Sequence, residues 1–271
     1  MNRKCLFQSL LGIIVFGWIV LQSAGPAQAQ EAQPQSQQQP VGQQAPAQPQ
    51  VQQQVPPPPP PQAAQTLPPV NTAGKMRLFL TGALGFGFDH ADVGVTTGGE
   101  EVKISGGGGA GIGFGLGFGL STDFDLDFDL GGQVSTLSPP VTNADGSFAR
   151  SYLLATIKRK IPTSESGQFK IGLGLGSYMN GKLDVDASHA LGAHEIVQYD
   201  NALGFHVTGE FERFIGQTTS INLGAKMYFV KYKARSWTHN GIAQPVDNLP
   251  SNVKDFNGNG LDFMLGFNVY F

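Results

Sequence analysis

The chain has 271 residues, of which 14% are charged, and its formal net charge is -3 at pH 7. A soluble domain usually has about a quarter of its residues charged, so this content is low. The mild charge, without any basic block, argues against nucleic acid as a partner.

The first 29 residues have the three parts of a secretory signal peptide: a basic start, an apolar stretch over about residues 10–21, and a small-x-small cleavage site at residues 27–29. The apolar stretch is of borderline length for an uncleaved membrane anchor, but the cleavage site favours removal. The mature chain is then expected to begin near Gln30. Cys5 is the only cysteine, so cleavage would leave no thiol for disulfide, metal or nucleophile chemistry.

Residues 30–73 form a tract rich in Gln and Pro, with six consecutive prolines at positions 56–61. Such a composition cannot bury a core, and the prolines favour extended polyproline II structure. The sequence therefore predicts a disordered periplasmic linker that acts as a semi-stiff spacer. A second hypothesis makes this tract a ligand for the cell wall or another envelope partner.

From residue 74 to residue 271 the pattern changes to alternating apolar residues separated by Gly, Asn, Asp, Ser and Pro clusters, which indicates strands and turns. The clearest run lies between Gly111 and Leu120, where Gly alternates with Ile, Phe or Leu. A helix would scatter these apolar groups, and each glycine would destabilise it by about 1 kcal/mol. Because no stretch here is long and apolar enough for a spanning helix, any membrane insertion has to use strands.

Eight such segments follow one another, each close to the length of about nine to eleven residues that a tilted spanning strand needs. They lie at about residues 76–88, 111–120, 124–130, 151–160, 169–175, 203–211, 221–229 and 261–271. In the fourth segment two phases compete for the outer face, Tyr152 with Leu154 and Leu153 with Ile157. The pattern predicts an all-β fold, a transmembrane antiparallel up-and-down β-barrel of eight strands. Ten strands remain an alternative if parts of the long loops pair.

The connections between these segments alternate in length. Those at residues 121–123, 161–168 and 213–219 are short, whereas the others are long and polar, the last from about Ser236 to Gly258. Short periplasmic turns and long outer loops are typical of outer-membrane barrels. An even strand count then places both termini in the periplasm and the long loops outside the cell.

The last segment ends in an aromatic residue. Counting back from Phe271, alternate positions carry Val269, Phe267, Leu265 and Phe263. This pattern resembles the C-terminal signature of bacterial outer-membrane barrels, which the barrel-assembly machinery is thought to read. With the eight segments, the region resembles the small-barrel superfamily that includes the membrane domain of outer-membrane protein A and related surface antigens.

This resemblance implies a location in the bacterial outer membrane, contact with its lipid, and recognition by the assembly machinery through the C-terminal strand. It implies little about activity, because members of this fold do many things. Unlike outer-membrane protein A, the sequence has nothing after the barrel segments, so we expect no cell-wall-binding domain there.

If the apolar faces point to lipid, a set of charged side chains faces the lumen together with His206. These are Asp125, Asp127, Asp129, Lys170, Glu210, Glu212, Lys226 and Asp262. An eight-stranded barrel is just wide enough for side chains to fill, so charges in it must pair or stay hydrated. The simplest interpretation is a structural network in which Lys170 and Lys226 neutralise carboxylates of adjacent strands, notably Glu210 and Glu212.

A narrow water-filled path is a second interpretation of the lumen. Glycines at alternate positions of residues 111–119, and at 172, 174 and 176, place no side chain on the inner wall. Acidic residues outnumber the two lysines of the set, so such a path would prefer cations. The same glycines would also let large groups such as Tyr178 or Tyr228 pack across the interior.

A lipid A-modifying enzyme is a third hypothesis, and it would need a nucleophile, a histidine base and an orienting acid near the outer rim. The histidines in or beside the predicted outer loops are His90, His189, His194 and His239. No serine stands in a recognisable nucleophile setting, and His189 with His194 lack a third ligand for a metal. We therefore expect no catalytic residue, metal or cofactor.

Taken together, these patterns predict a structural or surface-interaction protein, adhesin-like and without catalysis, in the outer membrane. The leading alternative is a small cation-preferring, porin-like channel. Trp237 is assigned to the aromatic belt at the lipid boundary.

Overall fold

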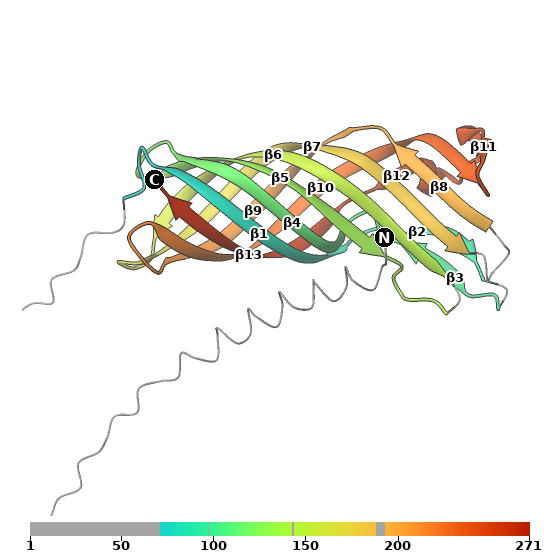
Figure 1. The fold of residues 1–271 in the computed structure, drawn as a ribbon, viewed down its shortest axis with the longest axis horizontal. Coiled ribbons are helices and arrows are strands. Elements are labelled where there is room, and N and C mark those ends of the chain that lie inside the picture. The colour runs from blue at the N-terminus through green and yellow to red at the C-terminus, as the bar shows by residue number, and fades with distance from the viewer. Residues whose placement is uncertain (1–70, 97, 143, 188–192) are drawn as a thin grey trace, which may run out of the picture. The chain divides into compact units, whose positions relative to one another are not determined.

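The computed structural model describes residues 71–271 except 97, 143 and 188–192. The predicted signal peptide, and the predicted linker up to residue 70, lie outside these residues and stay predictions. The described residues form an antiparallel β-barrel (Figure 1). None of the helices within them is long and apolar enough to cross a membrane.

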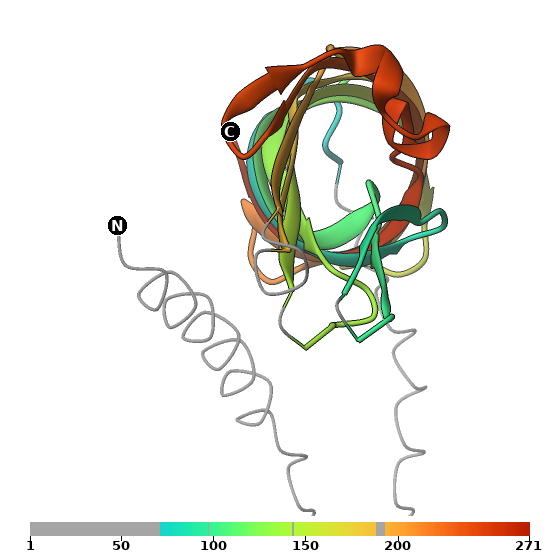
Figure 2. The same ribbon diagram turned by 90° about the vertical axis from the view of Figure 1, so that its right-hand side faces the viewer.

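Eight strands close the barrel wall. They are β1 (Met76–Gly87), β4 (Gly108–Gly119), β5 (Phe124–Thr136), β6 (Asp145–Pro162), β7 (Gly167–Ala187), β9 (Ala202–Phe214), β10 (Thr219–His239) and β13 (Gly260–Tyr270). Each pairs antiparallel with the next in this order, and β13 pairs with β1. The end-on view shows this closed ring (Figure 2). The prediction of an eight-stranded up-and-down barrel is confirmed, and the ten-stranded alternative is wrong.

The two ends of the barrel differ. At one end, called the turn end here, residues 120–123, 163–166 and 215–218 join the strands in short turns, as predicted. The other, extended end carries the remaining short elements (Figure 1). These are β2 (Ala91–Val95), β3 (Glu101–Ile104), β8 (Ala193–Tyr199), β11 (Ile242–Gln244), the 3-10 turn η1 (Val246–Asn248), α2 (Ser251–Lys254) and β12 (Asp255–Asn257).

Several strands run further than their apolar patterns predicted. β7 and β10 have 21 residues each, and β8 pairs with both of them, in line with β9. The predicted loops after the fifth and seventh segments are therefore partly strand. The pattern missed this because the outward residues become polar there, while inward residues such as Leu183, Val185 and Val197 stay buried.

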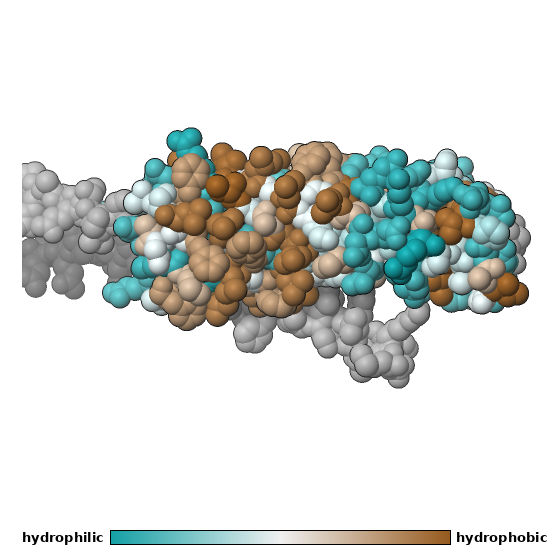
Figure 3. Space-filling view, turned by 90° about the horizontal axis from the view of Figure 1, so that it is seen from above, coloured by the Kyte–Doolittle hydropathy of each residue, from teal (hydrophilic) through white to brown (hydrophobic). Residues whose placement is uncertain are grey.

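Large apolar side chains cover the outer face nearer the turn end, and this surface is called the apolar belt here. Leu175 is 71% exposed and Leu203 is 84% exposed on this face. Figure 3 shows the belt as a band that gives way to hydrophilic surface toward the extended end. On β6, Leu153 and Ile157 face outward, whereas the neighbouring inward side chains are buried, which settles the phase of the ambiguous fourth segment.

β13 places the predicted C-terminal signature on the belt. Phe263, Leu265, Phe267 and Phe271 are exposed, and Val269 lies on the same outward face. The strand pairs with β10 on one side and β1 on the other, so it closes the barrel. Its recognition by assembly machinery stays a prediction.

Candidate functional site in the barrel lumen

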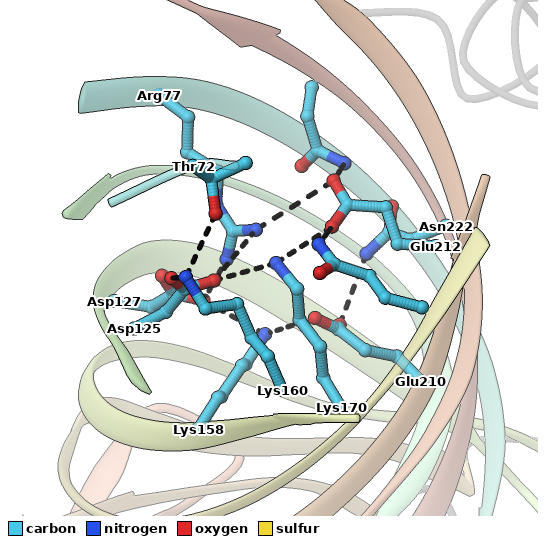
Figure 4. Close-up of polar contacts among 12 residues, drawn as sticks. Thr72, Arg77, Asp125, Asp127, Lys158, Lys160, Lys170, Glu210, Glu212 and Asn222 are labelled. Carbon is cyan, nitrogen blue, oxygen red and sulfur yellow. Dashed lines mark hydrogen bonds and ion pairs between the residues drawn. The ribbon is translucent and has the colours of Figure 1, made fainter. Parts of the chain in front are cut away.

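Inward residues of five strands form a buried ion network in the lumen near the turn end (Figure 4). Its charged members are Arg77, Asp125, Asp127, Lys158, Lys160, Lys170, Glu210 and Glu212. The Lys170 ammonium lies 2.7 Å from Asp125 and 2.7 Å from Glu212. The Lys158 ammonium lies 2.8 Å from both Asp127 and Glu210, so each lysine bridges two carboxylates.

Neutral groups complete the hydrogen bonding of Glu212, which is fully buried. The Tyr270 hydroxyl donates to its Oε1 at 2.5 Å, and the Gln168 amide donates to its Oε2 at 2.7 Å. Ser220 and Asn268 donate to it as well. A buried charge with this many partners is stabilised in place, and removing one partner would be costly.

The segment before β1 closes the turn end over this network. Thr72 is 2% exposed, and its hydroxyl accepts a hydrogen bond from Lys160 Nζ at 2.8 Å. The same ammonium lies 2.8 Å from Asp125. Gly74, with a φ of +73°, turns the chain, and its amide donates to the Gly119 carbonyl at 2.7 Å. Thr72 therefore forms part of the floor of the lumen.

The structure places all eight predicted lumenal charges inside the barrel, but it changes their pairing. Lys170 contacts Glu212 as expected. Lys226 does not contact Glu210 or Glu212; it lies 4.0 Å from Asp262 and 4.7 Å from the centre of the Tyr152 ring. Lys158 takes the expected place of Lys226 beside Glu210.

Sequence reasoning also missed four basic residues of the lumen, and these cancel the excess of acid on which its charge argument rested. They are Arg77, Arg150, Lys158 and Lys160, all buried. With Lys170 and Lys226 they make six cations, which match the six predicted carboxylates. The predicted excess of acid, on which the cation preference rested, is therefore wrong for the described lumen.

A layer of aromatic and polar groups lies above the network. The Arg150 guanidinium lies 4.7 Å from the Tyr228 ring centre and 5.6 Å from that of Tyr178. It also donates to Gln133 Oε1 at 2.6 Å, and Gln133 donates to Asp262 at 2.8 Å. This layer spans the lumen between the strands that carry these residues.

An aromatic cluster fills the extended end of the lumen. Phe148 packs edge to face on Tyr199, Tyr232 and Phe256, with ring centres 5.0 to 5.8 Å apart. Apolar residues of the connecting elements complete this core: Ala91, Val102, Ile104, Leu249 and Val253. The β2–β3 hairpin and the α2 region therefore share one apolar core with the aromatic cluster, and Figure 2 shows both at the rim of this end.

The inward glycines make room for neighbouring side chains rather than for an open path. A β-carbon at Gly113 would lie 2.6 Å from Asp129 Oδ1, and one at Gly172 would lie 2.7 Å from Thr208 Cγ2. At Gly115 it would collide with the Phe79 ring. The glycines on this wall therefore favour side-chain packing across the lumen over a water-filled path.

A cavity of about 40 Å³ remains in the middle of the lumen. Its lining includes Asp129, His206, Thr208 and Asn222, each with a buried polar atom that has no hydrogen-bond partner among the described residues. This volume suits a few water molecules. The cavity is therefore a small polar chamber between the ion network and the aromatic cluster.

Two of the four predicted outer histidines, His194 and His239, pair with carboxylates. His194 Nε2 lies 2.8 Å from Asp184, and His239 Nδ1 lies 2.5 Å from Glu195. Partial burial opposes ionisation of Asp184, but hydrogen bonds from Lys182 and His194 hold its pKa below the usual value. His189 lies outside the described residues. His90 lines a surface pocket with Asp92, Lys103 and Ser138, and neither of the two histidine–carboxylate contacts includes a hydroxyl group.

Trp237 does not lie in the apolar belt, contrary to the prediction. Its indole N–H donates to Glu195 Oε2 at 2.5 Å, and its register partner on β8 is the buried Val197. The side chain is therefore part of the mouth of the lumen. Phenylalanines and aliphatic side chains, not tryptophan, cover the described lipid-facing surface.

No family model matches the sequence, and no curated protein matches it. In fold, the chain is similar to small outer-membrane β-barrels. The outer membrane protein OprG from Pseudomonas aeruginosa is 14% identical, with a TM-score of 0.49, and the match covers 74% of this chain and 97% of that one. Neisserial surface protein A is 12% identical, with a TM-score of 0.41, and the match covers 73% of this chain and 96% of that one. The attachment invasion locus protein of Yersinia pestis is 12% identical, with a TM-score of 0.37, and the match covers 73% of this chain and 99% of that one.

Proposed function

We propose that the chain spans the bacterial outer membrane as a closed barrel that acts as a structural or surface-interaction protein, adhesin-like and without catalysis. The apolar belt supports the spanning arrangement, because such a ring of exposed Leu, Ile and Phe around a polar lumen is stable in lipid and unfavourable in water. In this arrangement the extended end faces outside the cell and both termini face the periplasm.

The observation that carries this proposal is the filling of the lumen. Thr72, the ion network, the Arg150 layer and the aromatic cluster follow one another along the barrel axis. A solute would have to displace buried, paired charges and a packed aromatic core. The surface that remains free to interact is therefore the outside of the extended end.

The extended end suits a binding surface because it is folded. β7, β8 and β10 continue beyond the belt as paired strands, and buried residues of β2, β3 and α2 belong to the same apolar core as their inward residues. A preformed surface loses little conformational entropy when a partner binds. Outward polar residues of these strands, such as Lys182, Asp184 and Gln198, would meet that partner first.

A small channel is the second candidate, and the cavity of about 40 Å³ is the observation that favours it. Conduction would require rearrangement on both sides of this cavity. The balanced lumenal charges give no reason to expect cation preference. Two further roles remain part of the proposal. The tract before Thr72 acts as a spacer or as a ligand for an envelope partner, and β13 is the strand that the assembly machinery recognises.

Cysteine labelling tests the spanning arrangement and its orientation. Ile242, which is 66% exposed next to the β10–β11 turn, is replaced by cysteine in a Cys5→Ser background. Gln217→Cys, in the exposed turn between β9 and β10, is the matched control for the other end. Membrane-impermeant maleimide on intact cells should label only Ile242→Cys, and Gln217→Cys should react after the outer membrane is permeabilised. The reverse pattern would overturn the orientation, and equal labelling would overturn the spanning arrangement.

A further inference from the structure

Three basic side chains occupy consecutive outward positions of β10 above the apolar belt. They are Lys231, Lys233 and Arg235, and they alternate with the inward residues Tyr232 and Ala234. All three are exposed, and the Lys231 side chain is 60% exposed. This set is called the basic row here.

The basic row continues the apolar belt without a break. Met227 and Phe229 are the outward residues of β10 directly before Lys231. The Phe229 ring stacks on Phe205 of β9, with ring centres 4.7 Å apart, and Leu203 at the start of β9 is 84% exposed. If the belt lies in hydrocarbon, the basic row lies where the lipid headgroups begin.

The charges of this row are little neutralised by the protein. Lys231 lies 3.9 Å from Asp255, at the limit of an ion pair. Asp255 is also the register partner of Lys233, but neither Lys233 nor Arg235 has a carboxylate within ion-pair distance among the described residues. Arg235 donates to the neutral Gln198 at 3.1 Å. The lumenal lysines contrast with them, since Lys158 and Lys170 each bridge two carboxylates.

Other basic residues of the extended end are paired. Lys182 on β7 lies 2.8 Å from Asp184, and Lys103 on β3 lies 2.5 Å from Glu101. Within the described extended end, the unpaired Lys and Arg charge is therefore concentrated on β10. A general need for solubility at the membrane boundary would not require this concentration.

We propose that the basic row binds the phosphate groups of an anionic, phosphate-bearing glycolipid in the outer leaflet. The inference rests on the proposed function, because it needs the belt in the membrane and the extended end outside. Neighbouring outward residues of a strand are about 7 Å apart, so two of these long side chains can converge on one phosphate. Arg235 can bind phosphate in a bidentate manner, and the lysines add point charges.

A lipid is the ligand source that the geometry favours. The row stands at the edge of the belt, so a molecule with its acyl chains against Phe229 and Leu203 would place its headgroup on the cations. A soluble phosphate compound would gain only the charge contacts. Joint use of the apolar and basic surfaces is what distinguishes the two sources.

The test uses the folded full chain in neutral detergent, titrated with bisphosphorylated lipid A and followed by native mass spectrometry. The variant Lys231→Gln/Lys233→Gln/Arg235→Gln should bind about 100-fold more weakly, since each basic residue near an anionic lipid surface contributes about 1 kcal/mol. The matched control Lys75→Gln/Arg159→Gln/Arg213→Gln removes the same charge from the turn end and should bind as the unaltered chain does. Dephosphorylated lipid A should bind all three proteins equally weakly.

Heat-modifiable gel mobility shows that each protein is folded before it is titrated. Equal binding of bisphosphorylated lipid A by the basic-row variant and the unaltered chain would overturn the proposal. Inorganic phosphate that competes as well as lipid A would overturn the lipid as the ligand. If the Ile242→Cys and Gln217→Cys variants give the contrary labelling pattern, the proposed function fails and this inference fails with it. A folded, correctly oriented barrel with no basic-row effect overturns this inference alone.

Discussion

Lys170 of β7 and Asp125 of β5 lie on strands that do not pair with each other, yet their charged atoms are 2.7 Å apart across the inside of β6. This contact shows that lumenal side chains reach over a neighbouring strand. The wall and the interior of the barrel therefore stabilise each other, and a change in the lumen should be measurable as a change in barrel stability.

Removing the Lys170 charge should destabilise the barrel strongly. Lys170→Met removes the cation nearest to both Asp125 and Glu212, and breaking a buried pair in this way costs about 3 to 5 kcal/mol. Urea unfolding of the refolded chain, followed by gel mobility, measures the change in the free energy of unfolding. Lys254→Met is the control, because its pair with Asp247 is exposed to solvent and should contribute little to stability. Equal effects of the two variants would contradict the structural role of the network.

Filling an inward glycine should disrupt folding. Gly115→Leu would drive a side chain into the Phe79 ring, so we expect a barrel that folds in low yield or unfolds at lower urea concentration. Gly82→Leu is the control, since its β-carbon would have its nearest neighbour 4.0 Å away. Folding yield in detergent measures both. A well-folded Gly115→Leu barrel of unchanged stability would mean that the wall beside β4 is open.

The aromatic cluster should hold the connecting elements in place. Phe148→Ala removes a ring that is 1% exposed and contacts Tyr199, Tyr232 and Phe256, which costs about 3 to 5 kcal/mol. Amide exchange of residues 246–257 should become faster, while the strands near the turn end keep their protection. Phe88→Ala, which removes an exposed ring, is the control, and its amide exchange at residues 246–257 should equal that of the unaltered chain. Unchanged exchange in Phe148→Ala would show that the loops pack independently of the cluster.

Acid should loosen the contact between β7 and β8. The pKa of Asp184 is lower in the folded chain than in the unfolded one, so its stabilising contribution is complete above the unfolded value, about 3.9, and is lost as the pH falls through the folded value. Amide exchange of β8 at pH 6 and at pH 3, corrected for the intrinsic rate, measures the effect. Asp184→Asn should remove the pH dependence. If that variant keeps it, another group is responsible.

Periodicity was enough to predict the strands, because a shift of one residue would turn every belt side chain into the lumen. The same alternation predicts an inward Arg77, because this residue lies between the outward Met76 and Leu78. Its place in the lumen was therefore predictable from the sequence. Lys158 and Lys160 were hidden in the segment whose phase was ambiguous until its partners β5 and β7 fixed it. Residues that meet across the lumen come from distant parts of the chain, so spacing could not predict their pairing.

Strand ends and the Trp237 contact were not predictable for a different reason. The outward polarity of β7 and β10 changes beyond the belt, and only their contacts with β8 and the loop core show that the sheet continues. Trp237 was assigned to the lipid boundary by residue type. Its contact with Glu195 depends on the register of β8 against β10, which the local sequence does not contain.

Planar-bilayer recording of the refolded full chain tests the closed lumen most directly. Thr72, the ion network and the aromatic cluster block the axis, so the refolded chain should leave the bilayer silent. Heat-modifiable mobility verifies that the same preparation is folded. Phe148→Ala, which loosens the extended end but leaves the ion network, should be silent as well. Reproducible unitary conductance of the unaltered chain would contradict the account and would make the small channel the better description of this barrel.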